Sequence, residues 1–265
     1  MLGPRLRHLP PNRAILLRNK TCVYCACSID KVSGTKEHVI GRRFVPKGSL
    51  DRDWNLILRA CRSCNGIKSD LEDDLSAITM QPDATGAHAV ADIVLQQEAE
   101  RKARNSTSRR TGRRVAESQE QFTVKFPFGP GVEFTFTGHT PPQVDHGRAY
   151  RLALFQLRAF FYFVTYNQDT RKGGFWPGSF SPFALAQKAD WGNAHFSAFT
   201  RAVKDWEPRF IGTGARGFFV VAIRRHPDAA TWSWALEWNQ NYRLIGFFGE
   251  HAPAQGIVKI GRAHV

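Results

Sequence analysis

The chain has 265 residues, of which 42% are hydrophobic, so it is long enough to bury an ordinary apolar core and to form two domains. Its 37 Lys and Arg residues against 23 Asp and Glu residues give a formal net charge of +14, which favours a polyanionic partner, nucleic acid first. The charge alone leaves open a basic surface that is simply solvated.

No segment predicts a membrane span or a secretion signal. The most apolar stretch, residues 152–164, is interrupted by Gln156 and Arg158 and is too short to cross a bilayer. The first thirteen residues are basic but are broken by prolines and lack an apolar core. We therefore expect a cytoplasmic protein without a membrane partner, whose five cysteines bind a metal or stay reduced.

The composition divides the chain into three segments. Residues 1–80 contain every cysteine, residues 81–120 contain no aromatic residue, and residues 121–265 contain all but three of the aromatic residues. Such a sharp change of composition predicts a domain boundary inside the middle segment.

Two Cys-x-x-Cys pairs in the first segment predict a zinc site. Two residues between thiolates allow both sulfurs of a tight turn to bind one tetrahedral ion, and two such pairs close the coordination sphere, which is typical of structural zinc. Cys27 is the fifth cysteine, and we expect a spare buried thiol there, although an exchange with Cys25 stays open. The expected zinc ligands are Cys22, Cys25, Cys61 and Cys64.

Three short motifs lie between and directly after these pairs. They are Glu37-His38-Val-Ile, Trp54-Asn55-Leu and Asn65-Gly-Ile-Lys68. In this order they resemble the HNH nucleases, also called the His-Me or ββα-metal finger family, over residues 20–75. The family more often has Asp at the position of Glu37 and His at the position of Asn65, and both variants are compatible with metal binding.

The resemblance implies a role for each residue. Glu37 and Asn65 would bind a catalytic Mg²⁺ or Mn²⁺, His38 would act as the general base, Asn55 would brace the hairpin, and Lys68 would contact phosphate. The chemistry agrees, because oxygen ligands suit a hard cation and imidazole accepts a proton near neutral pH. Each residue alone also has a structural interpretation: His38 in the core, Asn65 at a helix N-terminus, Asn55 in a turn.

The middle segment predicts a helix over residues 89–104 that runs into a flexible linker rich in basic residues. The linker is either a solvated tether or an arm that contacts phosphate. The basic residues of this region are Arg101, Lys102, Arg104, Arg109, Arg110, Arg113 and Arg114.

The last segment predicts an α+β domain with an antiparallel sheet. Trp232, Trp234 and Trp238 share one face of a strand by their even spacing, and we expect core positions there, with a base-stacking platform as the alternative. The expected elements are a hairpin of residues 122–126 and 132–136, helices over 147–166 and 183–206, a loop over 175–183, and strands over 217–224, 231–238 and 242–248. A break of the second helix near Gly192 stays open.

The sequence thus predicts an α+β protein with a zinc-stabilised ββα-metal finger in residues 1–80 and a recognition or regulatory domain in residues 121–265. The expected function is hydrolysis of phosphodiester bonds by an HNH endonuclease, with DNA as the favoured substrate. Bacterial or phage defence and restriction are hypotheses from this architecture, as is a protein partner or homo-oligomer through residues 121–265. The alternative is a zinc-ribbon module that binds nucleic acid without cutting it.

Overall fold

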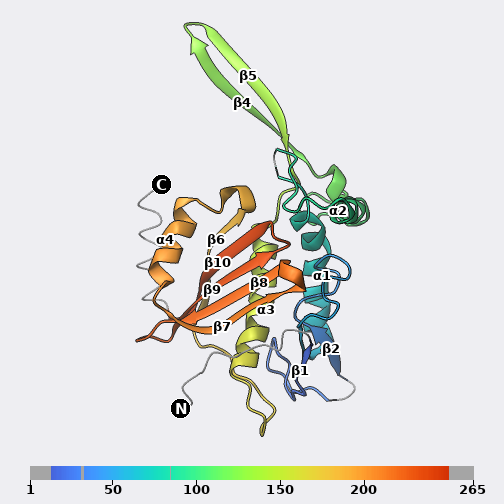
Figure 1. The fold of residues 1–265 in the computed structure, drawn as a ribbon, viewed down its shortest axis with the longest axis vertical. Coiled ribbons are helices and arrows are strands. Elements are labelled where there is room, and N and C mark those ends of the chain that lie inside the picture. Colours follow the sequence, from blue (N-terminus) through green and yellow to red (C-terminus); the bar gives the residue numbers. More distant parts are fainter. Residues whose placement is uncertain (1–12, 31–32, 84, 251–265) are drawn as a thin grey trace.

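The N-terminal part of the chain forms a small mixed sheet followed by a long helix. The computed structural model describes residues 13–30, 33–83 and 85–250, and Figure 1 shows their arrangement. The strand β3 is central and pairs with β1 in parallel and with β2 antiparallel. The elements are β1 (Ile15–Leu16), β2 (Gly34–His38), β3 (Leu56–Cys61) and α1 (Arg62–Thr79).

The C-terminal part contains a five-stranded antiparallel sheet in the order β6-β10-β9-β8-β7. The predicted α+β class with antiparallel sheets is therefore confirmed. The elements are α3 (His146–Val164), β6 (Ser179–Gln187), α4 (Ala194–Val203), β7 (Glu207–Gly214), β8 (Phe219–Arg225), β9 (Thr231–Trp238) and β10 (Tyr242–Gly249).

The helices α3 and α4 cover opposite faces of this sheet. Successive residues of a strand point to opposite faces, so Phe247 and Phe248 of β10 are separated. Phe247 packs with Phe199 of α4, with ring centroids 5.4 Å apart, whereas Phe248 packs with Phe161 of α3 at 5.6 Å. Trp234 and Trp238 are buried, and Trp232 packs against Phe161, which confirms the core interpretation of these tryptophans.

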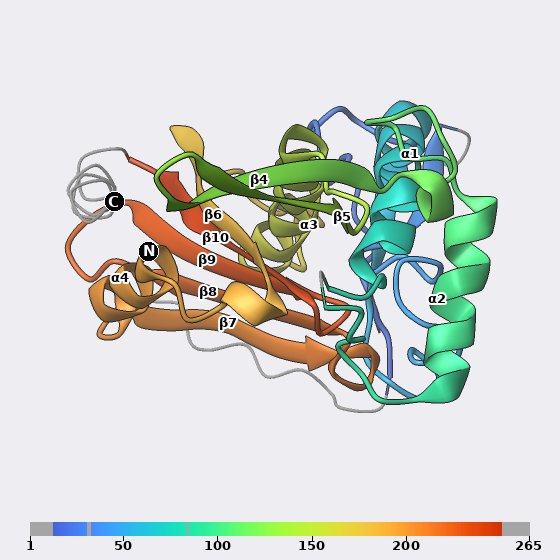
Figure 2. The same ribbon diagram turned by 90° about the horizontal axis from the view of Figure 1, so that it is seen from above.

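One apolar core joins the N-terminal and C-terminal parts. The ring of Trp54 packs edge-on against Phe210 of β7, and its Nε1 donates a hydrogen bond to the carbonyl of Thr213 (2.7 Å). Phe44 packs edge-on against Trp238 of β9. Figure 2 shows α1 between α3 and α2, so the C-terminal part supports the helix of the N-terminal part. The division into three segments stays a prediction about independent folding.

The turn between β9 and β10 holds the C-terminal end of α1. Asn239 Nδ2 donates to Thr79 Oγ1 (2.8 Å), and Asn241 Nδ2 donates to the carbonyls of Thr79 (3.0 Å) and Gln81 (2.8 Å). The last carbonyl groups of a helix have no hydrogen-bond donors within the helix, so the two asparagines supply donors that α1 itself lacks. Asn239 and Gln240 reach this arrangement with a left-handed backbone, φ 53° and 56°.

Three expectations for the last segment are wrong. The loop expected over 175–183 ends early, because β6 begins at Ser179. Residues 183–206 do not form one helix. Residues up to Gln187 belong to β6, Lys188–Asp190 form a short 3-10 helix, and α4 begins only after the break expected near Gly192. The strand β7 lies where no strand was expected. Pairing with β10 and with β8 outweighs the local pattern, as is common for strands whose partners are distant in sequence. The predicted hairpin and the first helix are confirmed as β4, β5 and α3.

The predicted helix of the middle segment is confirmed as α2 (Ile93–Asn105), and Asp92 caps it by accepting hydrogen bonds from the next residues. The segment after α2 was expected to be a flexible tether. Several of its arginines instead form ion pairs or hydrogen bonds with other parts of the chain. Arg109 bonds Asp70 of α1 (2.8 Å), Arg110 pairs with Glu120 (2.5 Å), and Arg114 donates to the carbonyl of Asn105 (2.8 Å).

A hairpin of two strands, β4 (Glu120–Gly129) and β5 (Val132–Thr140), extends away from the rest of the chain (Figure 1). Among the described residues, no helix is long and apolar enough to span a membrane.

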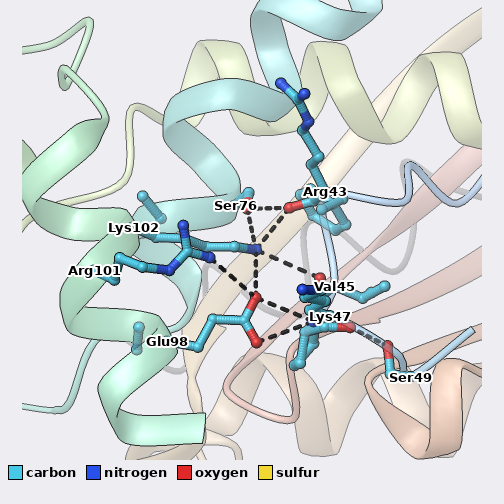
Figure 3. Close-up of polar contacts among 12 residues, drawn as sticks. Arg43, Val45, Lys47, Ser49, Ser76, Glu98, Arg101 and Lys102 are labelled. Carbon is cyan, nitrogen blue, oxygen red and sulfur yellow. Dashed lines mark hydrogen bonds and ion pairs between the residues drawn. The ribbon is translucent and has the colours of Figure 1, made fainter.

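Lys102 of α2 is largely buried and connects this helix to the rest of the N-terminal part through hydrogen bonds (Figure 3). Lys102 Nζ donates to the carbonyl of Arg43 (2.7 Å) and to Ser76 Oγ (3.0 Å), and it lies 3.8 Å from Glu98 Oε1. The carboxylate of Glu98 in turn accepts a hydrogen bond from the backbone N–H of Lys47 (3.0 Å). The side chain of Lys102 is only 13% exposed, and this burial lowers its pKa to about 8.

This lowered pKa predicts how Lys102 affects stability at high pH. Between pH 8 and pH 10.5 the unfolded chain keeps a proton that the folded chain has lost, so the contribution of Lys102 to the free energy of unfolding rises with pH. The free energy of unfolding of the wild type relative to Lys102→Met should increase across this window, by at most about 3 kcal/mol.

Denaturant unfolding at several pH values measures this difference. The exposed Lys204 provides the control, since Lys204→Met should give a difference from the wild type that does not change with pH. A flat difference for Lys102→Met would contradict a depressed pKa.

Candidate metal centre and active site

Four cysteines from two separate parts of the chain come together beside α1. Cys22 and Cys25 lie in the loop after β1, Cys61 ends β3, and Cys64 lies in the first turn of α1. Their sulfur atoms all lie within 4.8 Å of one another. Four thiolates around a tetrahedral zinc ion lie about 3.8 Å apart, given Zn–S bonds of about 2.3 Å. The cluster therefore fits a metal ion such as zinc.

The surroundings of the cluster suit thiolates. The backbone N–H groups of Cys61 and Tyr24 point at Cys22 Sγ, at 3.3 and 3.5 Å. The N-terminus of α1 begins at Arg62, and the partial positive charge of a helix N-terminus stabilises nearby anions. Cys27 is exposed, so the expectation of a buried thiol is wrong, and its sulfur lies 3.3 Å from Cys25 Sγ outside the cluster of four.

A buried ion pair joins β2 to α1. Lys68 Nζ lies 2.8 Å from Glu37 Oε1 and 2.6 Å from Glu72 Oε1, and it donates to the carbonyl of His38 (3.0 Å). The side chains of Glu37 and Lys68 are each 2% exposed. Burial disfavours the charged lysine, yet Glu72 and Glu37 together raise its pKa above the ordinary value. Lys68 therefore keeps its charge and holds the helix against the strand.

This cluster carries one more carboxylate than it has ammonium groups. Burial raises the pKa of Glu72, because a second anion is costly in a site with one cation. The carboxylate of Glu72 also packs on Gly41, where a Cβ atom would collide with it. The ammonium of Lys68 lies between the two carboxylates and offsets one of their charges.

Asn65 lies on the same side of β2 as Glu37. Residues 35 and 37 of a strand share a face, and Asn65 Nδ2 donates to Thr35 Oγ1 (2.9 Å). This hydrogen bond uses the amide nitrogen and fixes the orientation of the amide group. The amide oxygen is the atom that a hard cation would bind. Glu37 and Asn65 thus both belong to the contact between β2 and α1.

His38 ends β2 and points to the other face of the strand from Glu37. Its Nε2 lies 3.2 Å from Arg42. Partial burial and the neighbouring cations Arg42, Lys36 and Lys68 lower the pKa of His38 to about 4. The imidazole is therefore neutral at neutral pH and able to accept a proton.

Asn55 links the segment before β3 to the residues after β2. Its Oδ1 accepts from the backbone N–H of Ile40 (3.1 Å), and its Nδ2 donates to the carbonyl of the same residue (2.8 Å). Two bonds from one buried side chain fix the chain directly after His38. The geometry agrees with a bracing role and places no bond from Asn55 to the other candidate residues.

Two further residues belong to the site but carry no motif in the sequence. Tyr24 is buried between the cysteine cluster and Glu37, and its burial together with the charge of Glu37 raises its pKa. Its ring packs on Phe155 of α3 at 4.7 Å. Glu72 is the second partner of Lys68. Its position four residues after Lys68 was a signal for a contact on one helix face.

The cysteine cluster predicts a separable metal site. Cys22→Ser and Cys64→Ser should each lose the metal and lower the melting temperature, because metal binding contributes directly to folding. Metal analysis should find about one zinc per chain in the wild type, and circular dichroism follows the melting.

Cys27→Ser is the matched control, and it should keep both the zinc and the melting temperature. Zinc retained in Cys64→Ser would contradict the four-cysteine site. Zinc lost only in Cys27→Ser would show that Cys27 replaces one of the four.

Comparison of the chain with protein-family models, with curated proteins and with solved structures finds no match, so the candidate function rests on the residues and geometry of the site itself.

Proposed function

We propose that this protein is a metal-dependent endonuclease of the HNH type, which hydrolyses phosphodiester bonds with DNA as the favoured substrate. In this proposal β2, β3 and α1 form a ββα-metal finger, and a zinc ion on the four cysteines holds its shape. The observation that carries the proposal is the contact between β2 and α1, which brings Glu37 and Asn65 to one face of the strand and leaves His38 at its end.

Glu37 and Asn65 would hold a magnesium or manganese ion. When bound, such an ion stabilises the negative charge that develops on the phosphate. Lys68 is buried next to Glu37. Its role in the proposal is therefore to hold and partly neutralise that carboxylate, and it does not contact phosphate from the surface. Asn55 keeps the backbone after His38 in place.

His38 accepts the proton of the attacking water. The water oxygen forms a bond to phosphorus, the bond from phosphorus to the leaving oxygen breaks, and the proton goes to the imidazole. The lowered pKa leaves the imidazole neutral before the step, and a bound phosphate, by adding negative charge beside Arg42 and Lys36, would bring this pKa back toward its ordinary value. Lys36 and Arg42, on the same side of the strand as His38, supply positive charge that attracts the phosphodiester backbone.

A zinc-ribbon module that binds nucleic acid without cutting it is the second candidate. The buried pair between Glu37 and Lys68 favours it, since a carboxylate with a lysine partner also has a purely structural role. The two candidates differ in whether the basic protein cuts the nucleic acid that it binds.

Plasmid cleavage with Mg²⁺ or Mn²⁺ separates these candidates. The wild type should nick or cut the plasmid, and His38→Ala, Glu37→Gln and Asn65→Ala should each lose at least about 10²-fold in rate. All three should keep the zinc, since none of these residues belongs to the cysteine cluster.

Glu100→Gln, on an exposed position of α2, is the control and should cleave like the wild type. Binding without cleavage by the wild type would favour the zinc-ribbon module. Equal cleavage by the wild type and His38→Ala would exclude His38 as the base, and loss of zinc in Asn65→Ala would mean that the two metal sites are one.

Exposed cations next to His38 predict the salt dependence of DNA binding. Lys36 and Arg42 are exposed beside His38, and each phosphate contact lowers log affinity by about 0.9 per unit of log salt. Lys36→Gln with Arg42→Gln should therefore flatten the salt plot by about two contacts, for every DNA sequence alike. Arg109→Gln is the control, because Arg109 already pairs with Asp70. An unchanged slope in the double variant would move the DNA-binding surface elsewhere.

A further inference from the structure

The β4–β5 hairpin has one apolar face that no other part of the described chain covers. The register pairs Val124 with Phe136 and Phe126 with Phe134, so these side chains point to the same side. The exposed fractions of the apolar residues on the hairpin run from 36% to 59%. The apolar face comprises Phe122, Val124, Phe126, Val132, Phe134 and Phe136.

The opposite face of the hairpin is polar. Thr123 and Thr137 lie opposite each other with their hydroxyl groups 3.3 Å apart, and Lys125 pairs with Glu133 at 2.7 Å. The alternation is that of a strand pair with one face in water and the other against a core. Yet neither of the two hydrophobic clusters contains a hairpin residue.

An isolated two-stranded hairpin is at best marginally stable in water, and it needs further strands or a packed face. The apolar face amounts to roughly 500 Å² of exposed surface, which is a large patch for a monomer and marks an interaction site. The hairpin also projects from the rest of the chain, so another molecule can reach the face without touching the helices (Figure 1).

We propose that the apolar face of the hairpin is a dimerisation surface, which packs against the same face of a second copy of this chain. The two hairpins would form a four-stranded sandwich around a two-fold axis. Burying both faces removes on the order of 1,000 Å² of surface, which meets the lower limit for a specific interface.

The charge distribution of the hairpin disfavours a polyanionic partner and permits a second copy. The chain carries a formal charge of +14, so two copies repel each other over most of their surfaces. The hairpin itself has one lysine against two glutamates, and its apolar face has no charged residue. The repulsion between two copies is therefore smallest where their hairpins meet. A nucleic acid or an anionic membrane would need cations, and the single lysine, Lys125, is already paired.

Sedimentation equilibrium of the full chain, over about 1 to 100 μM, tests the surface. The wild type should be a dimer in this range. The variant with Phe126→Thr, Phe134→Thr and Phe136→Thr should be monomeric or should raise the dissociation constant at least tenfold. Threonine keeps the preference for strands, and the zinc content and melting of the two cores should not change.

The matched control changes the polar face, with Thr123→Ser, Thr135→Ser and Thr137→Ser, and should dimerise like the wild type. A wild type that stays monomeric at the highest concentration would overturn self-association. A dimer that persists in the phenylalanine variant would assign the interface to another surface. Either result leaves the cleavage assay unaffected, so the surface and the nuclease function are tested separately.

Discussion

Lys68 carries a buried ammonium between the carboxylates of Glu37 on β2 and Glu72 on α1, and the geometry of the candidate site depends on this contact. Removing one partner of a buried ion pair leaves an uncompensated charge, which commonly costs about 3–5 kcal/mol. The same ammonium donates a hydrogen bond to the carbonyl of His38, so it sets the separation of strand and helix at the end of β2. The cysteine cluster fixes the N-terminal end of the same helix, and together they leave α1 little freedom to slide along β2.

Much of the local structure could be predicted from the sequence. In the hairpin strands and β9, apolar residues recur at every second position, and in the long helix α3 they recur at every third or fourth position. Both patterns act within a short stretch of chain, so the sequence alone reveals them. The sequence of β6 predicts a loop that runs into a helix, and the sequence of β7 predicts no strand because Pro208, Gly212 and Gly214 weaken its local pattern. Both strands form because β10 and β8 supply hydrogen bonds from elsewhere in the chain.

The candidate site could also be predicted only in part, because some of its contacts depend on residues that are distant in the sequence. The spacing of the cysteines was sufficient to predict their convergence, since each pair lies in one turn and four thiolates share one ion. The position of Lys68 was not predictable, because its burial depends on two carboxylates that meet only when α1 packs on β2. Tyr24 and Lys102 are similar cases. Each owes its altered pKa to burial by residues that lie far away in the sequence.

The hydrogen bonds between the β9–β10 turn and the end of α1 have a consequence for communication through the molecule. The helix α1 is a rigid element with Asn65 and Lys68 in its N-terminal half. At its C-terminal end, Thr79 accepts hydrogen bonds from Asn239 and Asn241. Under the proposed function, a molecule that displaced this turn would tilt α1 and alter the affinity of Glu37 and Asn65 for a cation. Linkage is reciprocal, so the cation would alter the affinity for that molecule by the same factor. The turn between the inner strands β9 and β10 and the contact between β2 and α1 would then be coupled through the length of α1.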